Sequence, residues 1–261
     1  STGGNFIFIY LHIRIYGISF TNHSTPIGNL PKYLSACETR LMMFLIFLGS
    51  VRDSTPPRPA RLGHRVALAC QQYLQAAYPD IDTEIIDPLG YPPEKIFKPH
   101  FAYAKGKAPL HWEQLATKIE QADGYVMISP EYNHAMSPAL MDLLNHFGSS
   151  LFAFKPSAIV TYSAGQWGGM RAAVNMRTFL AELGCLPVSA MIHLPKAQEI
   201  FDEHGEFHPD VDGAAWQTYL GRTLIQLHWW ATATQTYRAL VNPHTLTPPF
   251  LMTPTQRNSP F

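Results

Sequence analysis

The chain has few cysteines, no excess of charge of either sign and no long apolar run. Its three cysteines, Cys37, Cys70 and Cys185, lie too far apart for a disulfide framework or a zinc-binding pattern, so we expect free thiols in a reducing, cytoplasmic compartment. Lysine and arginine total 19, as do aspartate and glutamate, and this zero net charge argues against a general nucleic-acid surface. No apolar run reaches the ~20 residues that cross a bilayer, so we expect no membrane span.

Several catalytic and phosphate-binding patterns are missing as well. Neither GxxxxGK[ST] nor GxGxxG follows the first strand-like run, which excludes a Walker loop and a dinucleotide fingerprint there. The segment GSVRDS at that point has Asp53 as its only acid and has no cysteine, which argues against a phosphoacceptor receiver and a cysteine phosphatase. His204 and His208 lie in HGEFHP, whose glycine and proline oppose a helical metal pair, so we expect no metal site.

The two ends of the chain differ from its middle. Residues 1–40 combine an apolar stretch, interrupted by Arg14, with a segment rich in turn-forming residues, and we expect a poorly ordered N-terminal extension without a role in chemistry. Residues 241–261 contain five prolines and are expected to form a loose tail. The middle, residues 41–240, is long enough for one sizeable α/β domain that ends in a helix.

Apolar strand-like runs alternate with helix-like segments through this middle part. The run LMMFLIFL, residues 41–48, ends at Gly49 and is typical of a parallel strand covered on both faces. Four further strands are expected, each separated from the next by a helix or a loop and helix, at residues 83–88, 124–130, 157–165 and 186–195. The alternation predicts a three-layer, doubly wound, five-stranded parallel sheet of flavodoxin-like order 2-1-3-4-5.

A sheet of this kind binds its ligand at the carboxyl ends of the strands, where the winding direction reverses. In the flavodoxin-like order that point lies between strands one and three. The loops that follow Leu48, Ser129 and Tyr162 should therefore converge, and all three contain residues suited to a ligand.

The first of these loops favours a phosphate. Gly49 and Ser50 allow a tight turn with amides and a hydroxyl aimed at one anion, and Arg52 adds charged donors that match phosphate oxygens. Arg58 or Arg61 could supply a second arm, and the following helix offers its positive N-terminal end. The alternative is an exposed basic loop solvated by water.

The second and third loops suit a flat ring. Tyr132 and Asn133 offer an aromatic face and an amide, although a turn capped by Asn133 explains them too. The third loop, YSAGQWGGMR, has three glycines within five positions, which permit close backbone approach, while Ser163 can donate a hydrogen bond. Its Trp167 could border a ring or lie on the surface.

Three motifs then carry a family resemblance: LGSVR, SPEYNHAMSPALMDLLNHF and KPSAIVTYSAGQWGGMRAAVNMRTFLAELG. Over about residues 44–195 the chain resembles the NADPH-dependent FMN reductases, flavodoxin-like enzymes that include quinone, chromate and azo-dye reductases. The resemblance implies that the FMN phosphate is held by Ser50, Arg52 and one of Arg58 and Arg61. It also implies that the flavin ring is bordered by Pro130, Glu131, Tyr132, Asn133, Ser163, Ala164, Gly165, Gly168 and Gly169.

The expected activity is transfer of a hydride from NADPH or NADH through bound FMN to a quinone or a similar small acceptor. Because the flavin carries this chemistry, we expect no catalytic acid, base or nucleophile from the protein. The alternatives are a flavodoxin-like electron carrier, a class that tends to be acidic, and an FMN-binding protein or scaffold without activity. The resemblance also implies a homodimer or homotetramer.

Overall fold

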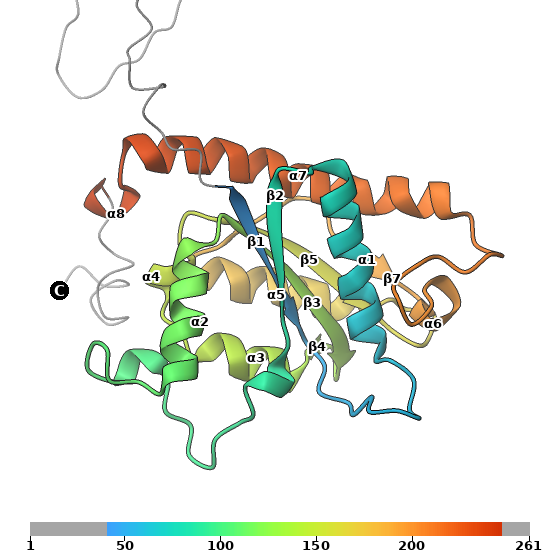
Figure 1. Cartoon of the computed structure of the whole chain (residues 1–261), viewed down its shortest axis with the longest axis horizontal. Coiled ribbons are helices and arrows are strands. Elements are labelled where there is room, and N and C mark those ends of the chain that lie inside the picture. The colour runs from blue at the N-terminus through green and yellow to red at the C-terminus, as the bar shows by residue number, and fades with distance from the viewer. Residues whose placement is uncertain (1–40, 247–261) are drawn as a thin grey trace, which may run out of the picture. The chain divides into compact units, whose positions relative to one another are not determined.

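The structure of the protein is a computed structural model that describes residues 41–246 (Figure 1). The expectations about residues 1–40, including Cys37, and about residues 247–261 lie outside the described part. Within residues 41–246, no helix is long and apolar enough to cross a membrane. No group of three or more histidine, cysteine, aspartate or glutamate side chains in the same part is placed to hold a metal ion.

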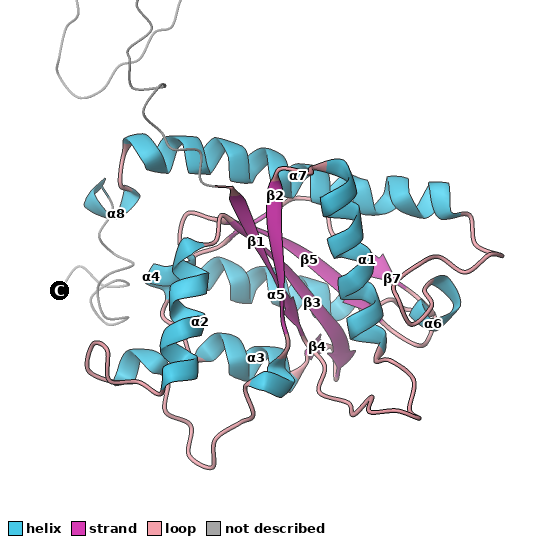
Figure 2. Cartoon of the chain, in the orientation of Figure 1, coloured by secondary structure: helices cyan, strands magenta, loops and turns pink. Residues whose placement is uncertain are grey.

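The centre of the domain is a mostly parallel sheet whose main order is β2-β1-β3-β5-β6 (Figure 2). This order confirms the predicted flavodoxin-like fold, because β5 and β6 are the fourth and fifth expected strands. The strands are β1 (Met42–Leu48), β2 (Ile81–Ile86), β3 (Gly124–Tyr132), β4 (Ala135–Met136), β5 (Pro156–Tyr162), β6 (Leu186–Pro187) and β7 (Ile192–Leu194).

The last predicted strand is broken into two short pieces, β6 and β7, which both pair with β5. The ladder continues as far as Val188, whose amide donates to the Ser157 carbonyl at 2.9 Å. The carbonyls at the break turn away from the ladder, and Arg177 of helix α5 donates to those of Pro187, Val188 and Ser189 at 2.8–3.3 Å. The carbonyls at the interruption therefore receive hydrogen bonds from a side chain instead of from a neighbouring strand.

Helices cover both faces of the sheet. They are α1 (Leu62–Ala77), α2 (Leu110–Gln121), α3 (Pro138–Asn145), α4 (Ser149–Phe152), α5 (Met170–Glu182), α6 (Ala197–Ile200), α7 (Gly213–Leu240) and α8 (Pro243–Leu246), with short 3-10 turns at Pro88–Gly90 and His100–Ala102. Helices α1 and α7 pack on one apolar cluster, and α2, α3 and α5 pack on the other. Both faces of β1 are buried, as its uninterrupted apolar sequence predicts.

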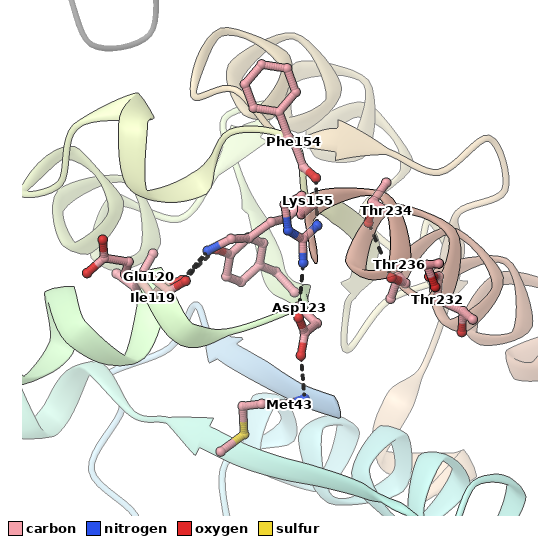
Figure 3. Close-up of polar contacts among 12 residues, drawn as sticks. Met43, Ile119, Glu120, Asp123, Phe154, Lys155, Thr232, Thr234 and Thr236 are labelled. Atoms are coloured by element: carbon pink, nitrogen blue, oxygen red, sulfur yellow. Dashed lines mark hydrogen bonds and ion pairs between the residues drawn. The ribbon is translucent and has the colours of Figure 1, made fainter. Parts of the chain in front are cut away.

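Two buried ionisable side chains fix the amino-terminal edge of the sheet (Figure 3). Lys155 is only 6% exposed, and its Nζ donates to the carbonyls of Ile119, Glu120 and Leu151 at 2.7–2.9 Å, which satisfies the end of α2. Asp123, which is also buried, accepts a bond from the Met43 amide at 3.1 Å. These contacts join α2 and the start of β1 to the body of the domain.

His146 lies under the loop that joins β2 to α2. Its ring is 1% exposed and stacks on Trp112 with centroids 3.9 Å apart, and within residues 41–246 neither ring nitrogen makes a hydrogen bond of good geometry. Burial lowers the pKa of His146, although Asp142, 3.9 Å from Nε2, acts in the opposite direction, as does Glu94. His146 is therefore neutral in the folded protein at neutral pH.

This histidine predicts a loss of stability in acid. Below the unfolded pKa of ~6.5 the unfolded chain binds a proton that folded His146 does not. The free energy of unfolding therefore decreases as the pH is lowered, by at most ~1.4 kcal/mol per pH unit. We expect His146→Leu to remove this part of the pH dependence. Urea unfolding at pH 7.5 and 5.0 measures it, with His204→Leu, on an exposed turn, as the matched control. Equal losses of stability in the wild type and His146→Leu would contradict the assignment.

Candidate active site

The structure brings the loops after β1, β3 and β5 to one edge of the sheet (Figure 1). A Cβ atom built on Gly49 would lie 2.6 Å from the Ile128 carbonyl oxygen and 3.0 Å from Ser137 Oγ, so the first loop packs directly on the second. A Cβ atom on Gly63, in the first turn of α1, would lie 2.6 Å from both Ser50 Oγ and the Tyr162 hydroxyl. The first loop, the start of α1 and the end of β5 thus meet at one point.

The meeting point has the character of an anion cradle. Ser50 Oγ is buried and makes no hydrogen bond of good geometry within residues 41–246. The N-terminus of α1 has no side-chain cap and no acid in its first turn, which leaves the amides of Leu62, Gly63 and His64 without an intrahelical partner. Such amides and the helix dipole favour a negative group beside them. The residues therefore fit a phosphate.

The three arginines of the first loop have different surroundings. Arg52 is exposed and forms no ion pair within residues 41–246, so its guanidinium is available at the rim. Arg58 is exposed and pairs with Asp53 in its own loop. Arg61 is 6% exposed, donates to the Ser50 carbonyl at 2.7 Å and pairs with Asp87 at the end of β2. The Arg61 guanidinium is thus already engaged inside the protein, where it holds the backbone of Ser50.

Tyr162, at the end of β5, is a part of the site that the sequence analysis did not assign. Burial raises the pKa of Tyr162 to about 12, although the neighbouring Ser50 hydroxyl acts to lower it. The Tyr162 hydroxyl therefore stays protonated at neutral pH and can donate a hydrogen bond at the cradle. The sequence did contain a signal for this role: a tyrosine at the carboxyl end of a predicted central strand places a hydroxyl group at the edge where the ligand is expected.

Burial also affects the histidine at the start of α1. It lowers the pKa of His64, and the charge of Arg61 lowers it further, while Asp87 raises it. His64 is therefore neutral at neutral pH and adds no positive charge to the cradle, whose only free cation is Arg52 within the described part of the loop.

The second loop is a tight hairpin, which the sequence analysis did not foresee. Strands β3 and β4 pair antiparallel and are joined by Asn133 and His134, with φ angles of 50° and 65°. Two consecutive residues of positive φ are typical of a type I′ turn, in which asparagine is favoured. Tyr132 is 52% exposed at the base of the turn, and Pro130 lies within β3, where its carbonyl accepts from Ser129 Oγ at 2.8 Å.

Glu131 joins the second loop to the third. Its side chain is 11% exposed, and its carboxylate accepts from the amides of Arg171 and Ala172 at 3.2 and 3.3 Å. The Arg171 guanidinium pairs with the same carboxylate at 2.8 Å. A carboxylate at the first turn of α5 is stabilised by the helix dipole. The carboxylate of Glu131 is thus engaged in holding the two loops together.

The third loop is shaped by its own serine and glycines. Ser163 Oγ donates to the Gly165 carbonyl at 2.7 Å and accepts from the Gly168 amide at 2.9 Å. Gly168 and Gly169 have φ angles of 61° and 76° and leave no room for a side chain against Pro195 and Thr161. Around the position of a Gly165 Cβ, in contrast, no atom lies within 4 Å. The open backbone of the loop is therefore at Gly165 and the exposed Ala164 before it.

The strand order and the three converging loops define a flavodoxin-like α/β protein. Residues 42–199 match the family of the NADPH-dependent FMN reductases, and because this match covers more than half of the chain, the protein belongs to that family. The resemblance drawn from the motifs is confirmed. The family consists of flavin-dependent oxidoreductases with FMN and NAD(P)H as cofactors, as predicted.

Relatives with known names share parts of the chain. An NAD(P)H-dependent FMN reductase of Pseudomonas aeruginosa is 29% identical over 154 residues, which are 58% of this chain and 80% of that protein. An NADPH azoreductase of a Bacillus species is 41% identical over 69 residues, 26% of this chain, and a quinone reductase of Escherichia coli is 37% identical over 81 residues, 30% of this chain. The matched segments span only 39% and 43% of those two relatives.

A solved structure shows the same fold. FerB, a flavoenzyme NAD(P)H:(acceptor) oxidoreductase from Paracoccus denitrificans, superposes with a TM-score of 0.52 at 18% identity. The superposition covers 73% of this chain and 98% of FerB.

Proposed function

We propose that the protein is an FMN-dependent oxidoreductase that takes a hydride from NAD(P)H and reduces a quinone or a similar small acceptor. The observation that carries the proposal is the cradle at the start of α1: within residues 41–246 the Ser50 hydroxyl makes no hydrogen bond of good geometry, and the first-turn amides have no side-chain cap. Family membership indicates which anion the cradle holds, because proteins of this fold bind the FMN phosphate at such a point.

Within this proposal the residues of the first loop have separate roles. Ser50, the first-turn amides of α1 and Arg52 hold the phosphate through hydrogen bonds and charge. Arg61 holds the Ser50 backbone in place from inside the protein, and Arg58 stays with Asp53. The second group that contacts the phosphate is then the N-terminus of α1, and neither Arg58 nor Arg61 is needed for this contact.

The second and third loops form the walls for the flavin ring. The Asn133 turn and the backbone amides of Ala164 and Gly165, whose carbonyls already accept hydrogen bonds, provide polar groups at the rim. The Glu131 contact to α5 keeps the two walls at a fixed distance. When bound, FMN supplies the redox chemistry by accepting a hydride and passing on electrons. The exposed rings of Tyr132 and Trp167 offer apolar surface to a flat acceptor or nicotinamide beside it.

Reconstitution with FMN tests the phosphate site. We expect Arg52→Ala to weaken FMN binding about tenfold, because one charge-assisted contact contributes ~1.5 kcal/mol or more. The matched control is Arg58→Ala in the same loop, which removes an arginine that is also exposed but already paired with Asp53, and should leave the affinity unchanged. Flavin fluorescence titration at low and high salt measures both. Equal affinities of Arg52→Ala and the wild type would contradict the role of Arg52.

The activity is tested separately from binding. We expect the isolated protein with FMN to oxidise NADPH steadily when a soluble quinone is the only acceptor. Tight FMN binding without such turnover, restored by a protein redox partner, would instead indicate a flavodoxin-like carrier. A protein that binds no FMN would overturn both assignments.

A further inference from the structure

The loop between β2 and α2, residues 88–111, carries an excess of positive charge. It contains four lysines and no arginine, and its only acid is Glu94. The lysines are Lys95, Lys98, Lys105 and Lys107, and all four are exposed. Because the whole chain has a net charge of zero, this loop concentrates charge of one sign on a short segment.

The same loop exposes large apolar side chains between its lysines. Ile96 is 78% exposed, Leu110 is 71% exposed and Phe101 is 62% exposed. Among residues 41–246, Ile96 and Leu110 are the most exposed of the large apolar side chains. Burying such side chains away from water is favourable, so the loop offers apolar contacts as well as charge.

The base of the loop is anchored to the domain. The Trp112 indole donates to the Glu94 carboxylate at 3.2 Å, and the His100 amide donates to the His146 carbonyl at 2.8 Å. These contacts engage one oxygen of the only acid in the loop at its base. The exposed lysines and apolar side chains therefore belong to a segment that is tied down at two points.

The loop begins at the carboxyl edge of the sheet, where the cradle lies. Asp87, the residue before it, pairs with Arg61, which holds the Ser50 carbonyl. The 3-10 turn Pro88–Gly90 then packs on α3, the helix that follows the second loop of the site. From this edge the loop extends beyond α2 and α3 (Figure 1). A flat surface that meets the loop thus faces the same edge as the site.

Charge and exposed aliphatic side chains together favour a lipid surface over other anionic partners. Lysine ammonium groups are attracted by anionic headgroups, while apolar side chains enter the boundary of the acyl chains. Nucleic acids are also anionic, but single strands are bound by stacking bases on aromatic side chains with support from arginine. The two most exposed apolar residues of this loop are aliphatic, and the loop has no arginine.

We propose that residues 88–111 dock the protein on an anionic lipid surface. Ile96, Phe101 and Leu110 enter the interface, and the four lysines lie among the headgroups. The docking is peripheral, and it turns the carboxyl edge of the sheet, with the cradle, towards the lipid. The proposal does not depend on the oxidoreductase activity, because it rests on the charge and exposure of this loop.

Flotation of the full chain with lipid vesicles tests the docking. We expect binding to phosphatidylcholine vesicles that contain about one third phosphatidylserine, and at least about tenfold weaker binding to pure phosphatidylcholine. Lys105→Gln combined with Lys107→Gln should weaken the binding about 25-fold, since each lysine near the surface contributes about fivefold. The control is Lys196→Gln, at an exposed lysine outside the loop, which should leave the binding unchanged.

A second variant tests the apolar contacts. We expect Ile96→Ser to weaken vesicle binding at least about tenfold at low and at high salt, whereas salt should screen the effect of the lysine variant. Ile225→Ser, at a half-exposed isoleucine of α7, is the matched control. Far-UV circular dichroism and FMN binding of each variant check that the fold and the cofactor site are intact.

Four results would each overturn the proposal. They are a wild type that does not bind anionic vesicles, equal binding to neutral vesicles, binding that the lysine and Ile96→Ser variants leave unchanged, and a single-stranded oligonucleotide that binds as tightly as the anionic vesicles. The last result would indicate attraction to phosphate groups in general instead of docking on lipid.

Discussion

Replacing Gly63 by alanine is expected to weaken FMN binding by about 10- to 100-fold, equivalent to the ~1–3 kcal/mol that overpacking costs. The new Cβ atom would lie 2.6 Å from both Ser50 Oγ and the Tyr162 hydroxyl. Both are the ends of side chains, so they move aside and the fold is kept while the cradle is displaced. Flavin fluorescence titration measures the affinity.

The control for this substitution is Gly90→Ala. A Cβ atom on Gly90 meets nothing within 4 Å, so this variant adds a methyl group at no steric cost and should bind FMN as the wild type does. Unfolding in urea shows whether either variant is destabilised. If Gly63→Ala bound FMN normally, the phosphate would have to lie elsewhere than at the start of α1.

Replacing Asp87 by asparagine is expected to weaken FMN binding and to destabilise the fold by about 1–3 kcal/mol. Asp87 pairs with the buried guanidinium of Arg61, which in turn holds the Ser50 carbonyl. Loss of the pair leaves a buried charge without its partner and lets the first loop move. Because Asp87 is itself a third exposed, we expect less than the full cost of breaking a buried ion pair.

The sign of the effect on affinity decides the role of Arg61. If Arg61 positions Ser50, both Asp87→Asn and Arg61→Met lower the affinity, and the double variant is little worse than either alone. If Arg61 were a phosphate ligand, Asp87→Asn would free it and raise the affinity. Titrations of the three variants, each corrected for its folded fraction, distinguish the two roles.

Much of the fold follows from local sequence. The uninterrupted apolar run of β1 has to be buried on both faces, and its alternation with helices leaves a doubly wound sheet as the consistent arrangement. The motif around Glu131 and the glycines before α5 are specific enough to indicate the family. The interrupted last strand and the β3–β4 hairpin were harder to predict, because a remote side chain such as Arg177, or two residues of positive φ, can change a short element without changing the sequence pattern around it.

The individual partners of the site residues could not be predicted in the same way. Arg52, Arg58 and Arg61 are equivalent donors in the sequence. Only the fold places Asp87, at the end of β2, beside Arg61, and within residues 41–246 it gives Arg52 no acidic partner. In the same way, Glu131 was assigned to the ring border, while the structure places its carboxylate at the first turn of α5. These contacts join residues 26 and 40 or more positions apart.

The sequence alone therefore determined the class of fold, the edge of the sheet at which the three candidate loops meet and the family, because burial, periodicity and short motifs are local properties of the chain. Within residues 41–246, the tertiary structure alone decided which arginine forms no ion pair, which hydroxyl makes no hydrogen bond of good geometry, and that Tyr162 lies at the cradle. Each of these depends on a distance between segments that are remote in sequence, and such distances are set only when the layers pack together.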